Sequence, residues 1–256
     1  STHTFSFEKA LNAYEFIIEK SEPFVGILLK YDTKSKVADF VHLSQETYPE
    51  ADVNIGFIGA GTFAQNSLLP YIKNVNMIAV STRSGHTSKS VSDKFKFKLN
   101  TCNSDEILNN ENINTVFIAT RHNSHAEFVK KAIELGKNVF VEKPLCMNEK
   151  ELEEIKDLYI TNINNGKNNR VMVGFNRRFS PHIKKIKNIF DDNLPIAINY
   201  RLNAGKILAE HWIQDKEIGG GRIIGEICHF VDLCMYISGS LPNSLSATAM
   251  KDPQNL

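Results

Sequence analysis

The stretch VNIGFIGAGTFAQ, Val53 to Gln65, decides the fold. Its first half mixes apolar and small residues, a pattern that predicts a buried β-strand. Gly59-Ala60-Gly61 then predicts a tight turn, and the residues from Thr62 onward open a helix that continues through Leu69. The stretch therefore predicts a strand, a glycine turn and a helix, in that order.

The small residues of this turn match the dinucleotide-binding form of such a unit. Gly59 allows the turn, Gly61 lets a pyrophosphate approach the backbone, and Ala64 lets the helix pack closely on the strand. Unpaired N–H groups in the first helical turn attract phosphate. The predicted pyrophosphate-binding residues are Gly59, Gly61, Thr62, Phe63 and Ala64. The alternative is a glycine turn that serves only the packing of a βαβ unit.

Bulk composition narrows the class of protein. A length of 256 residues with 42% hydrophobic content favours two globular domains. Lys and Arg number 30 against 29 Asp and Glu, so the chain lacks the basic footprint of a nucleic-acid or membrane-surface binder. We expect a small-molecule partner.

The cysteines predict a reducing compartment. Cys102, Cys146, Cys228 and Cys234 form no C-x-x-C pair, which favours free thiols in a cytoplasmic protein over a disulfide framework. Cys228, His229 and Cys234 suggest a metal site as an alternative, but structural zinc needs a fourth ligand, and we expect no metal. No apolar run reaches the roughly 20 residues of a membrane span, and the first residues lack a signal-peptide pattern.

Residues 1–32 form a separate predicted segment. Apolar residues from Ala10 to Ile18 recur at spacings of three and four, which predicts a helix that Ser6 caps, and Phe24 to Tyr31 predicts a strand. Residues 33–51 are polar and aperiodic and predict a linker.

The second strand of the nucleotide-binding unit is predicted at Asn76 to Ser81. An acidic residue at the end of this strand favours NAD, and a nearby arginine favours the 2′-phosphate of NADP. Here Thr82 and Arg83 occupy this place, so NADP is slightly favoured over NAD. The alternative is that Arg83 is only a solvated loop residue.

Two further apolar strands, Ile113 to Thr120 and Asn138 to Val141, predict a parallel sheet buried on both faces. A helix is predicted over residues 126–135 and another over 149–161, before a strand at 170–174. Loops that leave the carboxyl ends of such strands bind ligands. Residues 121–125 and 142–144 therefore converge on one crevice, with Thr120 and Glu142 at its edge.

The character of the sequence changes after residue 175. NRRFSPHIKKIKNIF, residues 176–190, predicts a basic helix, and a solvated helix face is favoured over a nucleic-acid patch. Strands are predicted at Ile196 to Leu202 and Leu245 to Met250, with a glycine-rich loop and a helix between them. The fold class is therefore α/β: a Rossmann doubly wound parallel sheet (52–175), followed by a partial α+β open-sheet domain (176–256).

Four stretches together, GFIGAGTFA, IATRHNSHAEFVKKAIELGKNVFVEKPL, VGFNRRFSP and GGGRIIGEICHFVDL, resemble the Gfo/Idh/MocA family of NAD(P)-dependent oxidoreductases. The likeness spans residues 52–256 and implies the same two-domain architecture. Residues 1–32 resemble the C-terminal end of medium-chain, zinc-type alcohol dehydrogenases. Together the two likenesses imply a bi-domain oxidoreductase with an upstream dehydrogenase domain, of a kind associated with surface-polysaccharide biosynthesis.

The resemblance also implies site residues. The lysine of the E-K-P stretch is Lys143, which in the family acts beside the nicotinamide on the substrate hydroxyl or carbonyl. Asn123 and His125 line the nicotinamide side, and His229 matches a histidine of the substrate site. Where the family has an aspartate four residues before that histidine, this chain has Gly225, and the neighbouring Glu226 points about 100 degrees away on a helix.

A further acidic residue, Asp232, lies three positions after His229 and is expected to orient its imidazole. The expected activity is hydride transfer between NAD(P) and a sugar or nucleotide sugar, with Lys143 and His229 as catalytic residues. The alternative is a non-catalytic nucleotide-binding or scaffold module, which the missing aspartate favours. The open sheet edge of the last domain suggests a homo-oligomer.

Overall fold

The computed structural model describes residues 2–19, 22–31, 41–42, 53–190 and 195–248. Contacts divide the chain into two compact units, residues 1–39 and 40–256, and each is described by itself. The described helices include none that is long and apolar enough to cross a membrane.

The first unit is a small βαβ arrangement. Strand β1 (Thr2–Ser6) pairs in parallel with β2 (Gly26–Lys30), and the short helix η1 (Phe7–Lys9) and helix α1 (Ala10–Glu19) connect them. The predicted helix and second strand are confirmed. Strand β1 was not predicted, because its five residues, THTFS, are mostly polar. The predicted cap is wrong, since the side chain of Ser6 makes no capping hydrogen bond.

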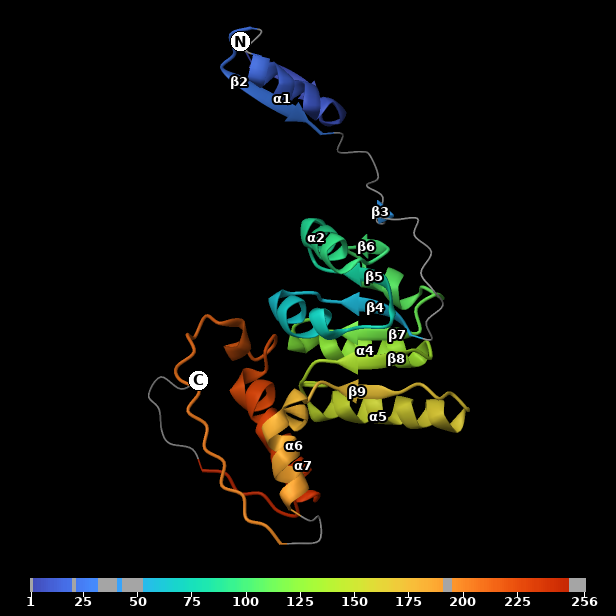
Figure 1. The fold of residues 1–256 in the computed structure, drawn as a ribbon, viewed down its shortest axis with the longest axis vertical. Helices are drawn as coiled ribbons and strands as arrows, with labels where there is room; N and C mark the ends of the chain where they lie inside the picture. Colours follow the sequence, from blue (N-terminus) through green and yellow to red (C-terminus); the bar gives the residue numbers. More distant parts are fainter. Residues whose placement is uncertain (1, 20–21, 32–40, 43–52, 191–194, 249–256) are drawn as a thin grey trace. The chain divides into compact units, whose positions relative to one another are not determined.

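The second unit is built on a seven-stranded sheet (Figure 1) in the order β3-β6-β5-β4-β7-β8-β9. The bounds are β3 (Val41–His42), β4 (Asn54–Ile58), β5 (Asn76–Ser81), β6 (Leu99–Thr101), β7 (Thr115–Ile118), β8 (Asn138–Val141) and β9 (Val171–Val173). All neighbouring pairs are parallel except β3 with β6. The strand order reverses between β4 and β7, and ligands bind at such a switch point.

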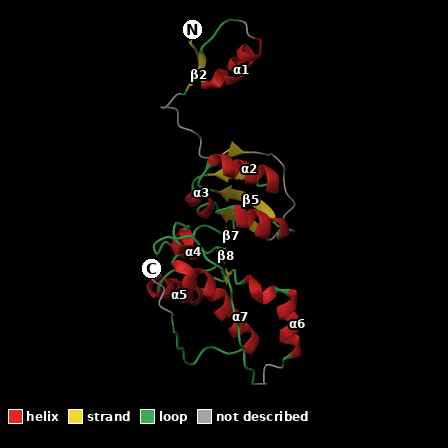
Figure 2. Ribbon diagram, turned by 90° about the vertical axis from the view of Figure 1, so that its left-hand side faces the viewer, coloured by secondary structure: helices red, strands yellow, loops and turns green. Residues whose placement is uncertain are grey.

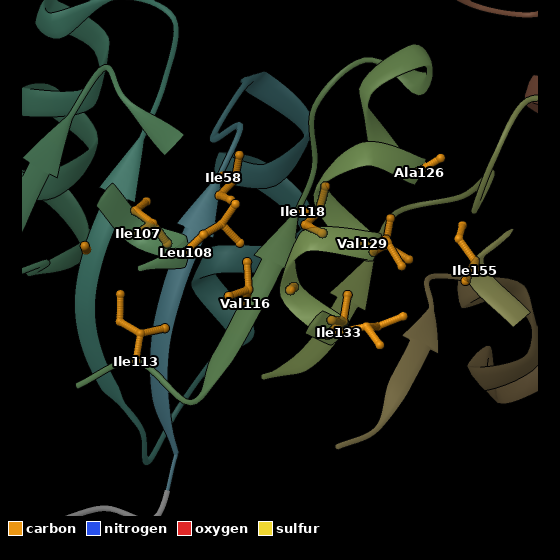
Figure 3. Packing of buried hydrophobic residues seen from close by; sticks show 14 of the residues in the cluster. Ile58, Ile107, Leu108, Ile113, Val116, Ile118, Ala126, Val129, Ile133 and Ile155 are labelled. Carbon is orange, nitrogen blue, oxygen red and sulfur yellow. The ribbon is translucent and has the colours of Figure 1, made fainter. Parts of the chain in front are cut away.

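Helices cover both faces of this sheet. Consecutive residues of β4 point to opposite sides: Phe57 packs with Ala64 and Val91, whereas Ile58 packs with residues of α3, α4 and α5. Figure 3 shows this second cluster, with Ile118 and Val129 at its centre. The helices concerned are η2 (Ala64–Leu68), α2 (Gly85–Phe95), α3 (Ser104–Leu108), α4 (His125–Glu134) and α5 (Glu149–Asn164). The predicted doubly wound sheet is confirmed.

The last part of the chain carries η5 (Asn176–Phe179), α6 (Pro181–Ile189), η6 (Trp212–Gln214), η7 (Ile223–Ile227) and α7 (Cys228–Ser238). Helices α6 and α7 contact each other (Figure 2). The predicted basic helix and the glycine loop that enters a helix are confirmed.

Three predictions for the second unit need correction. Residues 196–202 form no strand, because no described segment pairs with them. Residues 245–248 also lack regular structure, and 249–250 lie outside the described residues. The predicted linker contains β3, whose backbone adds to the edge of the sheet, while residues 33–40 and 43–51 lie outside the description. The division of this unit at residue 175 stays a prediction.

Candidate functional site

A pocket of about 690 Å³ lies at the carboxyl ends of β7 and β8. The structure brings six of the predicted site residues together in its lining: Phe63, Thr120, His125, Glu142, Lys143 and His229. Side chains from the last part of the chain form the opposite wall, among them Arg177 and Trp212. Residues from both predicted domains therefore face the same cavity.

The glycine turn has the geometry of a phosphate cradle. Gly59 adopts a left-handed φ of 89°, and its N–H donates to the carbonyl of Ser81 at 2.9 Å. A side chain there would lie 2.6 Å from Thr120 Cγ2. Gly61 is exposed, and apart from its chain neighbours a Cβ at this position would meet no atom of the described residues within 4 Å. Gly59 is thus required for packing, and Gly61 leaves the helix-initiating backbone open to a ligand, so these residues fit a dinucleotide.

Beyond the residues of the glycine turn, Thr82, Arg83 and Asn123 also lie outside this pocket lining. Thr82 and Arg83 follow β5, where the hydroxyl of Thr82 donates to the carbonyl of Ser84 at 2.8 Å and Arg83 is exposed. Asn123 is exposed, and its backbone N–H donates to the carbonyl of Ile218 at 3.2 Å. Their cofactor roles stay predictions.

Lys143 is held by the segment where the aspartate is missing. Its Nζ donates to the carbonyl oxygen of Gly225 at 2.7 Å. A Cβ at Gly225 would lie 2.9 Å from Cε1 of His122 and 3.2 Å from Ile213 Cδ1. Any side chain at 225 would therefore displace His122, which accounts for a glycine here. Glu226 does not replace the aspartate in this pocket, since it accepts from Arg222 at 2.8 Å and lines a separate apolar groove.

Glu142 is a buried carboxyl beside Lys143. Its exposed fraction is 7%, and Oε1 is buried with no hydrogen-bond partner among the described residues. Burial raises the pKa of Glu142 to about 6. This oxygen faces the backbone of Gly174, where a Cβ would lie 2.9 Å from it.

His125 connects the two loops that form the pocket floor. Its ring nitrogens lie 2.7 Å from the carbonyl oxygen of Pro144 and 3.2 Å from that of Thr120. Burial lowers the pKa of His125. Because both nitrogens face protein carbonyls, this side chain orients the loop of Lys143, and its predicted contact with the nicotinamide stays a prediction.

His122 is a pocket residue that the sequence did not single out. Its Nδ1 lies 2.8 Å from the carbonyl oxygen of Gly219, so Nδ1 donates and Nε2 is left as an acceptor. The side chain is 5% exposed, and burial lowers its pKa to about 4. No local pattern indicates this role, because the contact joins residues 97 positions apart.

His229 is neutral near pH 7, since burial, followed by the charges of Lys143 and Arg177, lowers its pKa to about 4. Its Nδ1 is buried with no hydrogen-bond partner among the described residues. The expectation that Asp232 orients this imidazole is wrong. Arg178 binds both carboxylate oxygens of Asp232, with Nε donating to Oδ2 at 2.6 Å.

Metal ligands do not gather in the part of the chain that the structure describes. No group of three or more His, Cys, Asp or Glu is positioned to hold an ion there, and the four cysteines are free thiols.

The buried state of His122 predicts a dependence of stability on pH. A histidine whose pKa falls on folding contributes stability that is present above the unfolded pKa of about 6.5 and is lost as the pH falls toward the folded pKa of about 4. The free energy of unfolding should fall less between pH 7.5 and pH 5 in His122→Gln than in wild type. We expect the difference to be up to about 2 kcal/mol. Urea denaturation at both pH values measures this change. Equal pH dependence in wild type and variant would contradict it, and the exposed His86→Gln is the control.

Residues 53–175 match a family model described as "Oxidoreductase family, NAD-binding Rossmann fold". Oxidoreductase P35 of Formosa agariphila is 29% identical over 76% of this chain and 63% of its own length. Levoglucosan dehydrogenase, solved in complex with NADH and levoglucosan, matches with a TM-score of 0.58 at 22% identity over 73% of this chain and 54% of that chain.

The 3-ketoreductase KijD10 of Actinomadura kijaniata, solved with NADP and TDP-benzene, has a TM-score of 0.59 at 16% identity. It covers 72% of this chain and 57% of its own. The chain thus spans less than two thirds of each of these proteins. The structural likenesses support the fold, and residues 53–175 are similar to the Gfo/Idh/MocA oxidoreductase family through the match to its model.

Proposed function

We propose that this protein transfers hydride between a nicotinamide dinucleotide and a carbohydrate hydroxyl or carbonyl carbon. The observation that carries the proposal is the position of Lys143 in one pocket with Phe63 of the glycine-turn helix, Glu142 and His229. The likeness to a levoglucosan dehydrogenase and a 3-ketoreductase supports a sugar substrate. The cradle at Gly61 supports the cofactor.

In this proposal, separate groups of residues bind the cofactor and exchange protons with the substrate. Gly59, Gly61, Thr62, Phe63 and Ala64 bind the pyrophosphate, and Thr120, Asn123, His125, Glu142 and Lys143 surround the nicotinamide half. The bound cofactor supplies or accepts the hydride. Lys143 exchanges a proton with the substrate oxygen, and the carbonyl of Gly225 orients its Nζ. His229, neutral near pH 7, hydrogen-bonds or exchanges a proton with the same substrate.

NADP is our slightly favoured cofactor. Arg83 follows β5, where a cation would meet a 2′-phosphate, and Thr82 leaves no carboxylate to repel it. The solved neighbours include one with NADH and one with NADP, so the fold accommodates both cofactors.

We also propose that the first unit packs on an upstream zinc-type dehydrogenase domain of the same polypeptide, in a bi-domain enzyme of surface-polysaccharide synthesis. Large apolar side chains of this unit are exposed, including Leu11 at 78% and Val25 at 87%, and burial by such a domain would stabilise them.

The free cysteines support a cytoplasmic location. The unpaired segment 196–202 supports pairing in a homo-oligomer.

A scaffold or regulatory module is the second candidate, and one observation favours it: Gly225 replaces the family aspartate. A turnover screen distinguishes the enzyme from the scaffold module. It follows NAD(P)H absorbance with levoglucosan, other sugars and their oxidised forms. The enzyme proposal predicts turnover that depends on Lys143. Coenzyme binding without turnover of any sugar would favour the scaffold.

A further inference from the structure

Two consecutive arginines of η5 have different surroundings. Arg178 is bound by Asp232, a carboxylate that is only 6% exposed, and this ion pair holds η5 on α7. Arg177 has no carboxylate partner among the described residues. Its guanidinium lies 4.7 Å from the centre of the Phe230 ring and lines the pocket of Lys143. Contact with a ring face uses none of the guanidinium's hydrogen-bond donors.

The nearby carboxylates are already bound to other arginines. Asp232 binds Arg178, and Glu226 binds Arg222 at 2.8 Å. Within the described lining, Glu142 is the acidic side chain, and it lies next to Lys143 on the other wall. The lining histidines are neutral near pH 7, because burial lowers the pKa of His122 and of His229 to about 4. Arg177 and Lys143 therefore give the pocket an excess of positive charge.

The N-terminus of helix α6 adds to the positive electrostatic potential of the pocket. Ser180 lines the pocket and is the N-cap of α6, which starts at Pro181. The positive end of the helix dipole therefore lies at the pocket wall that holds Arg177. Asn176 and Ser180 place an amide and a hydroxyl in the same lining.

We propose that the carbohydrate substrate carries an acidic group, a carboxylate or a phosphate, and that Arg177 binds it. The inference rests on the proposed function, since it defines the substrate class of the same pocket. Arginine's planar fork suits either anion, because two N–H groups donate to two oxygens at once. Arg177 is thus a specificity-determining residue, whereas Arg178 is structural.

The test compares three sugars by calorimetry on the full chain loaded with NADPH or NADH: D-glucose, D-glucuronate and D-glucose 6-phosphate. The two acidic sugars separate a carboxylate site from a phosphate site. We expect at least one of them to bind about 10- to 100-fold more tightly than glucose, and Arg177→Gln to abolish that difference. Lys185→Gln is the matched control, because it removes one charge from the exposed face of α6 outside the pocket lining.

Equal affinity for glucose and both acidic sugars, or no binding of either acidic sugar, would overturn the inference. An equal loss of acidic-sugar affinity in Arg177→Gln and Lys185→Gln would also overturn it. So would an Arg177→Gln variant that loses affinity for NADPH alone. The coenzyme is titrated separately on each protein. Failure of wild type to bind any coenzyme would contradict the proposed function. In that case the sugars are titrated on the coenzyme-free chain, where the same comparison decides the anion site.

Discussion

Replacing Gly61 by valine is expected to leave the fold intact and to weaken nicotinamide dinucleotide binding by about 100-fold or more, or about 2.7 kcal/mol. Apart from its chain neighbours, no atom of the described residues lies within 4 Å of a Cβ at this position, so a valine side chain meets no obstacle there. It would instead occupy the space through which a pyrophosphate approaches the backbone. Calorimetric titration with NADH and NADPH measures the loss.

Gly59 provides the matched comparison. Alanine at this position must adopt a φ of 89° and would place its Cβ 2.7 Å from the backbone nitrogen of Thr120. We expect Gly59→Ala to lower the free energy of unfolding by at least about 1–2 kcal/mol, the cost of a left-handed residue alone. Urea denaturation should therefore separate a structural glycine from a ligand-binding one. Equal destabilisation by both variants, or unchanged coenzyme affinity in Gly61→Val, would contradict these roles.

The second large effect is expected at Lys143. Methionine retains most of the side chain's length but cannot exchange a proton, so we expect Lys143→Met to lower kcat by about 10²- to 10⁴-fold. Arginine should not restore the rate, because its guanidinium does not give up a proton in proteins. The measurement is the initial rate of NAD(P)H formation or consumption with the best sugar from the turnover screen.

Two controls make this result specific. Lys150→Met alters a lysine whose side chain is 85% exposed and should leave the rate unchanged. Urea denaturation shows whether loss of the Lys143 contact with Gly225 has unfolded the protein. A folded Lys143→Met variant that turns over at the wild-type rate would exclude the proposed proton exchange.

Buried apolar strands were the part of the fold most accessible from sequence. Strands β5 and β8 have the predicted bounds, because each is an apolar run that ends at a polar or charged loop. Helix α2 was not predicted: its sequence, GHTSKSVSDKF, is largely polar, and two serines contribute to its buried face. Residues 196–202 have the pattern of a strand but form none. A β-strand requires hydrogen bonds to a neighbouring strand, and the local sequence does not specify that neighbour.

The candidate site also contains residues that the sequence predicts and residues that only the fold reveals. The glycine turn and Lys143 follow directly from motifs at strand ends, which topology brings together. His122 could not be identified, because its position depends on Gly225 and Gly219, about a hundred residues away. Arg177 and Arg178 are equivalent in sequence, and only the fold shows which one Asp232 binds. The same ion pair accounts for the incorrect expectation that Asp232 orients His229.

The central claim is that the glycine turn and the adjoining pocket bind a nicotinamide dinucleotide. Titration of the wild-type chain with NADPH and NADH, followed by the fluorescence of the reduced nicotinamide, tests it most directly. We predict saturable binding with an altered emission, with NADPH bound more tightly through Arg83, and loss of that signal in Gly61→Val. A folded wild-type chain that changes the fluorescence of neither coenzyme would contradict the claim.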